Sequence, residues 1–244
     1  MELAEYDLMD AVEDGMWWYR ALHAQVLDAL DSVRPGDGRL LDAGCGTGGF
    51  LARLRQERPD QPAAGLEYNP AAAARAAAKS GVPVVAGTIN AMPFADVSFS
   101  VVVSLDVLSH GAVDPEPALA EMLRVLRPGG VLIVNLPAFE WLRSTHDIRV
   151  QNARRFTRTT AAAMLAGAGL TQVRPHYWNS LLLPMMVLHR KVLARSPERR
   201  SDVAQFPPWL DNSLHAVTRL ERSLLASGFP FPAGGSVLAT ALRP

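Results

Sequence analysis

The stretch from Leu40 to Phe50 constrains the fold more than any other part of the chain. It reads Leu-Leu-Asp-Ala-Gly-Cys-Gly-Thr-Gly-Gly-Phe, and a helical pattern begins at Leu51. A glycine-rich turn from a buried strand into a helix lets a ligand approach the backbone closely, because no Cβ stands in the way. The start of the helix also offers free N–H groups and a partial positive charge. We therefore predict an α/β fold with a ligand site at this turn.

Asp42 indicates which kind of ligand the turn binds. Gly44, Gly46 and Gly49 also fit the G-x-G-x-x-G pattern of dinucleotide-binding loops. A carboxylate two residues before the first glycine repels a pyrophosphate, whereas it can accept hydrogen bonds from an ammonium group. We therefore favour a ligand that carries an amino-acid moiety over a dinucleotide.

Polar residues follow the next predicted strands. Glu67 ends the strand predicted at residues 63–67, about 18 residues after the glycine loop, which is close to the spacing at which an acid binds ribose hydroxyls in nucleotide-binding folds. Strands are also predicted at 82–86 and 99–105, and Asp106 follows the latter. Because the carboxyl ends of parallel strands line the ligand crevice, we expect these residues near the glycine loop.

Composition excludes several classes of protein. The chain has 244 residues, is 49% apolar and carries no formal net charge, so no overall field favours nucleic acid. Cys45 is the sole cysteine, which excludes an intrachain disulfide and agrees with a cytoplasmic location. The acidic N-terminus does not resemble a signal peptide, and no apolar run reaches the length of a membrane-spanning helix. The six histidines lack the spacing of metal ligands, so no metal site is expected.

Two motifs together resemble one family. Asp-x-Gly-x-Gly-x-Gly begins at Asp42, and Arg-Val-Leu-Arg-Pro-Gly-Gly-Val-Leu occupies residues 124–132. Both resemble motifs of the class I, Rossmann-like S-adenosylmethionine-dependent methyltransferases of type 11. The resemblance covers residues 38–136 well and 157–177 loosely. It implies an α/β three-layer sandwich with a seven-stranded, mostly parallel sheet whose last strand is antiparallel, and S-adenosylmethionine as the cofactor.

The resemblance also implies a set of cofactor contacts. In similar methyltransferases an Asp at the position of Thr88 holds the adenine amino group, so Thr88, Asn90 or backbone near Ile89 must substitute for it. Ser100 replaces another usual acid. The cofactor-binding residues predicted on this basis are Asp42, Gly44, Cys45, Gly46, Gly48, Glu67, Tyr68, Thr88, Ile89, Asn90, Leu105 and Asp106.

Candidates for catalysis and acceptor binding rest on residue type and position. Methyl transfer needs a base only when the acceptor must lose a proton. His146, His110 and Tyr177 are the candidates for that role, although a solvated loop for His146 and helix-start hydrogen bonding for His110 are equally open. The predicted acceptor-contacting residues are Trp18, Tyr19, Arg149 and Trp178, with core packing as the alternative for the first two.

We predict one domain over residues 1–244. Residues 1–35 form a helical lid, residues 36–177 and 236–244 form the Rossmann-like core, and residues 178–235 form a helical insertion between the sixth and seventh strands. The insertion contains an apolar run at 181–188, with basic residues at 189–191 and 195–200. This run could cap a hydrophobic acceptor, form a dimer contact or core, or lie against a membrane surface.

The predicted function is S-adenosylmethionine-dependent methylation of a small, hydrophobic acceptor by a monomer or homodimer. The departures at Thr88 and Ser100 keep a second function open, a non-catalytic binding or partner-activating subunit with the same fold. An NAD-dependent oxidoreductase is a third possibility, against which Asp42 and residues 124–132 argue.

Overall fold

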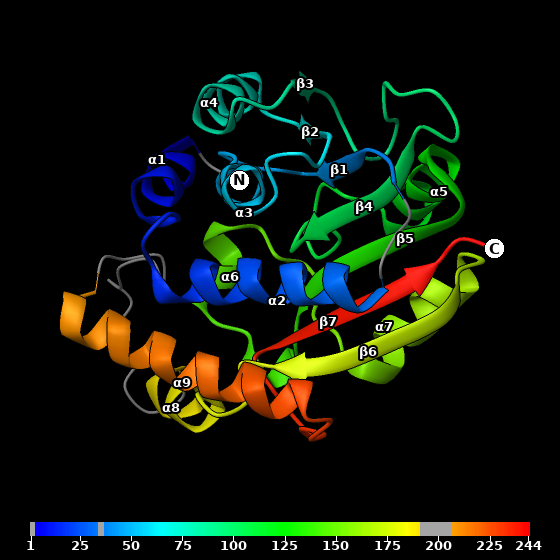
Figure 1. Ribbon diagram of the computed structural model, residues 1–244. Coiled ribbons are helices and arrows are strands. Elements are labelled where there is room, and N and C mark those ends of the chain that lie inside the picture. Colours follow the sequence, from blue (N-terminus) through cyan, green and yellow to red (C-terminus); the bar gives the residue numbers. More distant parts are fainter. Residues whose placement is uncertain (1–2, 34–36, 191–205) are drawn as a thin grey trace.

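The computed structural model describes residues 3–33, 37–190 and 206–244 (Figure 1). In this part of the chain, seven strands form one sheet in the order β3-β2-β1-β4-β5-β7-β6. β7 is antiparallel to both of its neighbours, and the pairs from β3 to β5 are parallel. The strands are β1 (Leu40–Ala43), β2 (Ala63–Glu67), β3 (Val84–Ala86), β4 (Phe99–Leu105), β5 (Leu126–Pro137), β6 (Thr171–Trp178) and β7 (Ser236–Leu242).

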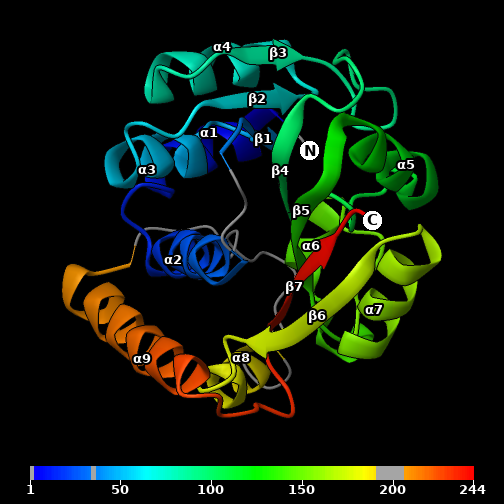
Figure 2. The ribbon, with the colours of Figure 1, turned by 45° about the vertical axis from the view of Figure 1, so that its right-hand side comes forward.

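Helices cover both faces of the sheet and complete the three-layer sandwich (Figures 1 and 2). Side chains of a strand alternate between faces, so Val102 packs toward α5 and α7, whereas Val101 and Val103 pack toward α2, α3 and α4. The helices are α1 (Leu3–Val12), α2 (Trp17–Val33), α3 (Gly49–Glu57), α4 (Pro70–Ser80), α5 (Pro115–Val125), the 3₁₀ helix η1 (Glu140–Leu142), α6 (Thr145–Arg149), α7 (Arg158–Gly167), α8 (Leu183–Leu188) and α9 (Pro208–Ala226). The predicted fold class is confirmed.

Local signals explain where the helices begin and end. The Asn69 side chain accepts hydrogen bonds from the N–H groups of Ala71 and Ala72 at the start of α4, and Pro70 occupies the first turn. Gly81 ends α4 in the left-handed conformation. The Thr157 side chain caps α7 by accepting a hydrogen bond from the Thr160 N–H.

The fifth strand differs from the prediction. The sequence alone predicts a turn at 127–130 and a strand at 131–135, but β5 already begins at Leu126, which pairs with Phe99 before a bulge. The Pro-Gly-Gly segment belongs to the strand because Arg243 pairs with it, although Gly129 has a φ of 73°: the Gly129 N–H donates to Arg243 O, and the Arg243 N–H donates to Gly130 O, both at 2.9 Å. The third strand is also shorter than predicted and begins at Val84.

The insertion packs against the N-terminal helices. The Trp17 N–H donates to Asp211 Oδ1 of α9 at 2.7 Å, and the Arg222 guanidinium pairs with Asp28 of α2 at 2.7 Å. Trp17, Leu182 and Leu214 form a small core of their own. Residues 191–205, which include the predicted basic cluster at 195–200, lie outside the described residues. The described part of the insertion therefore forms a layer on α2.

Candidate active site

The carboxyl ends of β1, β2, β4 and β5 lie at one edge of the sheet because these strands are parallel. The loop that follows β1 there is the glycine loop predicted from the sequence. Gly44 and Gly48 have φ values of 94° and 92°, where an L-residue is strained. A Cβ on Gly44 would also lie 2.4 Å from Val107, and one on Gly48 would lie 2.7 Å from the Ala76 backbone. Glycine is therefore required at both positions by the turn itself.

Gly46 faces the N-terminal helix instead of the core. Its φ is 56°, and a Cβ there would lie 2.7 Å from Met9 Cε of α1. α1 therefore covers the glycine loop.

Glu67 ties the glycine loop to the end of β2. Its Oε2 accepts a hydrogen bond from the Gly46 N–H at 2.9 Å, and its Oε1 accepts from the Asn69 N–H at 3.0 Å. The Tyr6 hydroxyl of α1 donates to the same Oε1 at 2.7 Å. A carboxylate has about four acceptor positions, so about one remains for a ribose hydroxyl.

Asp42 lies buried at the end of β1. Its Oδ1 accepts no hydrogen bond from any residue that the structure describes. Burial, followed by the negative charges of Glu67 and Glu13, raises the pKa of Asp42 to about 8. An ammonium group from a ligand would supply both the missing donor and the missing positive charge, so this carboxylate fits the methionyl end of S-adenosylmethionine.

The loop after β3 offers an amide for adenine. The Thr88 hydroxyl accepts from the Asn90 N–H at 3.2 Å and so serves the turn. Asn90 Oδ1, by contrast, is buried and has no partner among the described residues. Because an amide oxygen accepts hydrogen bonds and the adenine amino group donates them, Asn90 fits the missing role better than Thr88.

The remaining predicted cofactor residues differ in exposure. Ile89 is buried beside Asn90, Leu105 is half-buried, and Tyr68 is exposed. Cys45 is buried, and burial raises the pKa of its thiol, so it is not a reactive cysteine. Its N–H donates to Leu66 O at 3.0 Å and helps to shape the loop.

Sequence reasoning missed the polar contacts between α1 and the glycine loop. Glu13 is buried and accepts from the Thr47 hydroxyl at 2.6 Å, and Lys79 of α4 pairs with it at 2.7 Å. Lys79 also pairs with Asp10 at 2.5 Å. The available signal was helical spacing, since Tyr6, Asp10 and Glu13 recur every three or four residues on one side of α1.

Asp106 directly follows β4, at the same edge of the sheet as the glycine loop. It has a φ of 58°, and both of its carboxylate oxygens accept from Asn135 Nδ2 of β5, at 3.0 and 2.9 Å. Asn135 Oδ1 in turn accepts from Trp178 Nε1 at 2.8 Å. Burial raises the pKa of Asp106 to about 6, against the opposing effects of the Asn135 hydrogen bonds and the Arg155 charge.

Aromatic side chains of α2 adjoin this chain of hydrogen bonds. The Trp18 ring lies 6.1 Å from the Trp178 ring and 5.0 Å from the Tyr19 ring, between centroids. Burial raises the pKa of Tyr19, and the negative charges of Glu13 and Asp106 add to the effect. The predicted acceptor residues Trp18, Tyr19 and Trp178 therefore come together beside Asp106.

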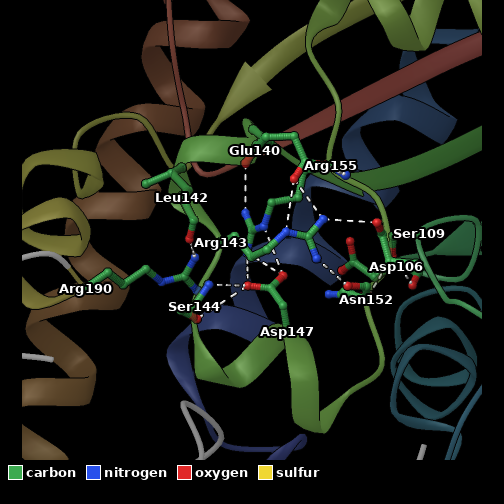
Figure 3. Close-up of polar contacts among 12 residues, drawn as sticks. Asp106, Ser109, Glu140, Leu142, Arg143, Ser144, Asp147, Asn152, Arg155 and Arg190 are labelled. Carbon is green, nitrogen blue, oxygen red and sulfur yellow. Dashed lines mark hydrogen bonds and ion pairs between the residues drawn. The ribbon is translucent and has the colours of Figure 1, made fainter. Parts of the chain in front are cut away.

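A buried ion pair lies next to Asp106 (Figure 3). Arg155 Nε and Nη2 each donate to an oxygen of Asp147 at 2.9 Å, and Arg155 Nη1 donates to Ala138 O at 2.8 Å. The Ser144 N–H also donates to Asp147. These bonds hold α6 against the end of β5. The predicted acceptor residue Arg149 lies half-buried in the same short helix.

The three predicted catalytic residues occupy different surroundings. His110 Nδ1 accepts from the Ala112 N–H at 3.2 Å, and burial lowers the pKa of the imidazole. The Tyr177 hydroxyl accepts from the Arg158 N–H at 3.2 Å, and its ring stacks on Phe139 in the core under α7, which favours a packing role. His146 belongs to α6, but its side chain lies outside the described part of the structure.

The family model of the methyltransferase domain matches residues 41–134, which include the glycine loop, Glu67, Asn90 and Asp106. Residues 41–134 thus match the methyltransferase family, and this match supports a class I S-adenosylmethionine-dependent methyltransferase. A demethylmenaquinone methyltransferase of Beutenbergia cavernae is 38% identical to it over 135 residues, which are 53% of this chain and 52% of that protein. A 37.1 kDa uncharacterised protein in transposon TN4556 of Streptomyces fradiae is 36% identical over 145 residues, 57% of this chain and 41% of that one.

The chain spans about half the length of the curated relatives that it matches. Among solved structures, a chain of the complex that contains the Haloferax volcanii Trm112 methyltransferase activator aligns with a TM-score of 0.63 and 21% identity, over 98% of each chain. That likeness shows the fold. Within residues 3–33, 37–190 and 206–244, no helix is long and apolar enough to span a membrane, and no group of three or more His, Cys, Asp or Glu side chains could hold a metal ion.

Proposed function

We propose that this protein transfers the methyl group of S-adenosylmethionine to a small, hydrophobic acceptor. The observation that carries the proposal is the meeting of the glycine loop, Glu67 and Asn90 at one edge of the sheet. Asp42, Glu67 and Asn90 would hold the ammonium, ribose and adenine ends of the cofactor. The cofactor supplies an electrophilic methyl group when it is bound.

The protein's own contribution is to position the acceptor and exclude water. Much of the rate of an in-line displacement comes from holding the two reactants aligned in a dry site. α1 lies over the glycine loop through Met9 and Glu13, and Trp18 and Tyr19 adjoin Asp106 on the acceptor side. These aromatic rings support a hydrophobic acceptor, as does the relative named for demethylmenaquinone.

Location and assembly belong to the same proposal. The single cysteine supports the cytoplasm, and the neutral net charge supports a small-molecule acceptor over nucleic acid. The described insertion helices lie on α2, with Leu181, Met185 and Leu188 exposed on α8 or just before it, so a homodimer contact or a peripheral membrane contact remains open beside the monomer.

The alternative function is a non-catalytic or partner-activating subunit. Thr88 and Ser100 favour it, because each hydroxyl is engaged locally, with the Asn90 N–H and with Arg39 O respectively. The unpartnered Asn90 oxygen favours retained cofactor binding instead.

The proposal is tested by calorimetric titration with S-adenosylmethionine, and with NAD in parallel. Binding of S-adenosylmethionine alone is expected, and Gly46→Arg should abolish it because the new side chain meets α1 over the loop. Gly167→Arg is the matched control, since that glycine has open space around it at the end of α7. Binding of NAD alone would overturn the proposal. Cofactor binding without turnover on any acceptor would favour the non-catalytic alternative.

A further inference from the structure

The Asp106 carboxylate is half-buried at the carboxyl end of β4, and no ion pair with a described residue neutralises it. In the described part of the chain, Asn135 Nδ2 is the hydrogen-bond donor to both of its oxygens. The nearby Arg155 donates its hydrogen bonds to other groups: its Nε and Nη2 donate to Asp147, and its Nη1 donates to Ala138 O. A buried carboxylate is costly unless a positive charge compensates it.

The position of this carboxylate is fixed by two neighbours. Trp178 Nε1 can only donate, so the Asn135 side chain must present its oxygen to Trp178 and its NH₂ group to Asp106. The Asp106 N–H donates to Asn135 O at 2.9 Å, which fixes the backbone as well. The Asp106 side chain thus points toward β5 and the ion pair of Arg155 and Asp147 (Figure 3). Asp42, by contrast, lies at the glycine loop.

The aromatic rings beside Asp106 favour the same kind of ligand. Trp18, Tyr19 and Trp178 form one cluster, with centroid separations of 5.0 and 6.1 Å along it. The faces of indole and phenol rings attract cations, and most strongly where water is excluded. A carboxylate and aromatic rings at one place are the chemistry that recognises an ammonium group.

We propose that the acceptor carries a protonated amine on an apolar body, and that Asp106 pairs with this amine beside Trp18, Tyr19 and Trp178. The inference rests on the proposed function, because it names the class of acceptor for that site. The apolar body contacts the half-buried rings of Trp18 and Tyr19, which the fully buried Trp178 supports, and the ammonium group supplies a positive charge to Asp106. Asp106 is then a specificity-determining residue that touches the substrate.

The test compares two probes that share an apolar body and differ in the polar group, the cationic phenethylamine and the neutral 2-phenylethanol. Binding is measured by calorimetry at neutral pH, with and without S-adenosylhomocysteine. The wild-type protein should bind the amine about tenfold more tightly than the alcohol, as expected for a charge-assisted hydrogen bond. Equal binding of the two probes to the wild type would overturn the proposal without any variant.

Asp106→Asn removes the charge and keeps the shape, and asparagine tolerates the left-handed backbone at this position. The preference for the amine should disappear, and the readout is the ratio of amine to alcohol affinity, measured with and without S-adenosylhomocysteine. Asp60→Asn, in the exposed turn before β2, is the matched control and should keep the preference. A loss of S-adenosylmethionine affinity in Asp106→Asn, with the amine preference intact, would assign Asp106 to the cofactor and overturn the inference.

Failure of the proposed function has a different signature. In that case the wild type would bind neither S-adenosylmethionine nor S-adenosylhomocysteine. The amine preference, measured without cofactor, would still decide the role of Asp106.

Discussion

The Tyr6 hydroxyl occupies an acceptor position on Glu67, at 2.7 Å from Oε1. The N–H groups of Gly46 and Asn69 fill two more positions, and both are fixed by the glycine loop and the start of α4. A ribose diol brings two donors to a carboxylate that has about one position left. Tyr6 is therefore the donor that must move when both ribose hydroxyls bind Glu67.

Tyr6→Phe should consequently tighten cofactor binding. Binding to the wild type breaks the Tyr6–Glu67 hydrogen bond, whereas binding to the variant does not. A net hydrogen bond of about 1 kcal/mol corresponds to about a fivefold gain in affinity, and the cofactor-free variant should lose a similar free energy of unfolding. Calorimetry and urea denaturation measure the two effects. Weaker cofactor binding by Tyr6→Phe would mean that the hydroxyl contacts the cofactor directly.

Asn90→Leu should weaken S-adenosylhomocysteine binding about tenfold, because the adenine amino group loses its acceptor. Thr88→Val should have a much smaller effect, since the Thr88 hydroxyl serves the turn. Calorimetry with S-inosylhomocysteine, which lacks the amino group, provides the ligand-side control. The wild type should discriminate between the two ligands, and Asn90→Leu should not. If instead Thr88→Val bound S-adenosylhomocysteine and S-inosylhomocysteine equally well, Thr88 would be the residue that contacts adenine.

Much of the fold was predictable because its signals are local. Asn69 and Pro70 start α4 by contacts within three residues, and the β-branched run at 99–105 is a strand whichever neighbours it meets. The glycine loop was predictable for a similar reason, as its positive φ values admit glycine and little else. The start of β5 was not, because its Pro-Gly-Gly segment depends on pairing with Arg243, more than a hundred residues away.

The candidate site was predictable as a set of positions but not as a set of bonds. Strand ends placed Glu67 and Asp106 at the crevice, yet the partners Tyr6 and Asn135 come from distant elements. Tyr177 and Trp178 show the limit most clearly. They are adjacent in β6, but strand side chains alternate, so Trp178 reaches Asn135 while Tyr177 packs under α7. Residue type alone could not decide between the two faces.

Asp42 should make the protein less stable as pH rises. Its pKa is about 8 in the fold, above the ordinary value of 3.8, so the folded state binds the proton more tightly than the unfolded state. The stabilisation is full below the ordinary pKa and is lost as pH rises to the folded pKa, with a slope of up to about 1.4 kcal/mol per pH unit. Urea denaturation of the wild type and Asp42→Asn across this window measures the slope. The difference between the two cancels other titrating groups, and a difference that does not depend on pH would contradict the prediction.

The ion pair between Arg155 and Asp147 is buried, with side chains 3% and 0% exposed. Arg155→Met leaves the Asp147 carboxylate uncompensated, and we expect a loss of about 3–5 kcal/mol in the free energy of unfolding. Arg53→Met is the matched control, because Arg53 pairs with Glu57 on the surface of α3 and should cost about 0.5 kcal/mol or less. The double variant Arg155→Met/Asp147→Asn should recover part of the loss, since it removes the stranded charge. If instead Arg155→Met costs no more than Arg53→Met in urea denaturation, water must reach the pair and the site beside Asp106 is not dry.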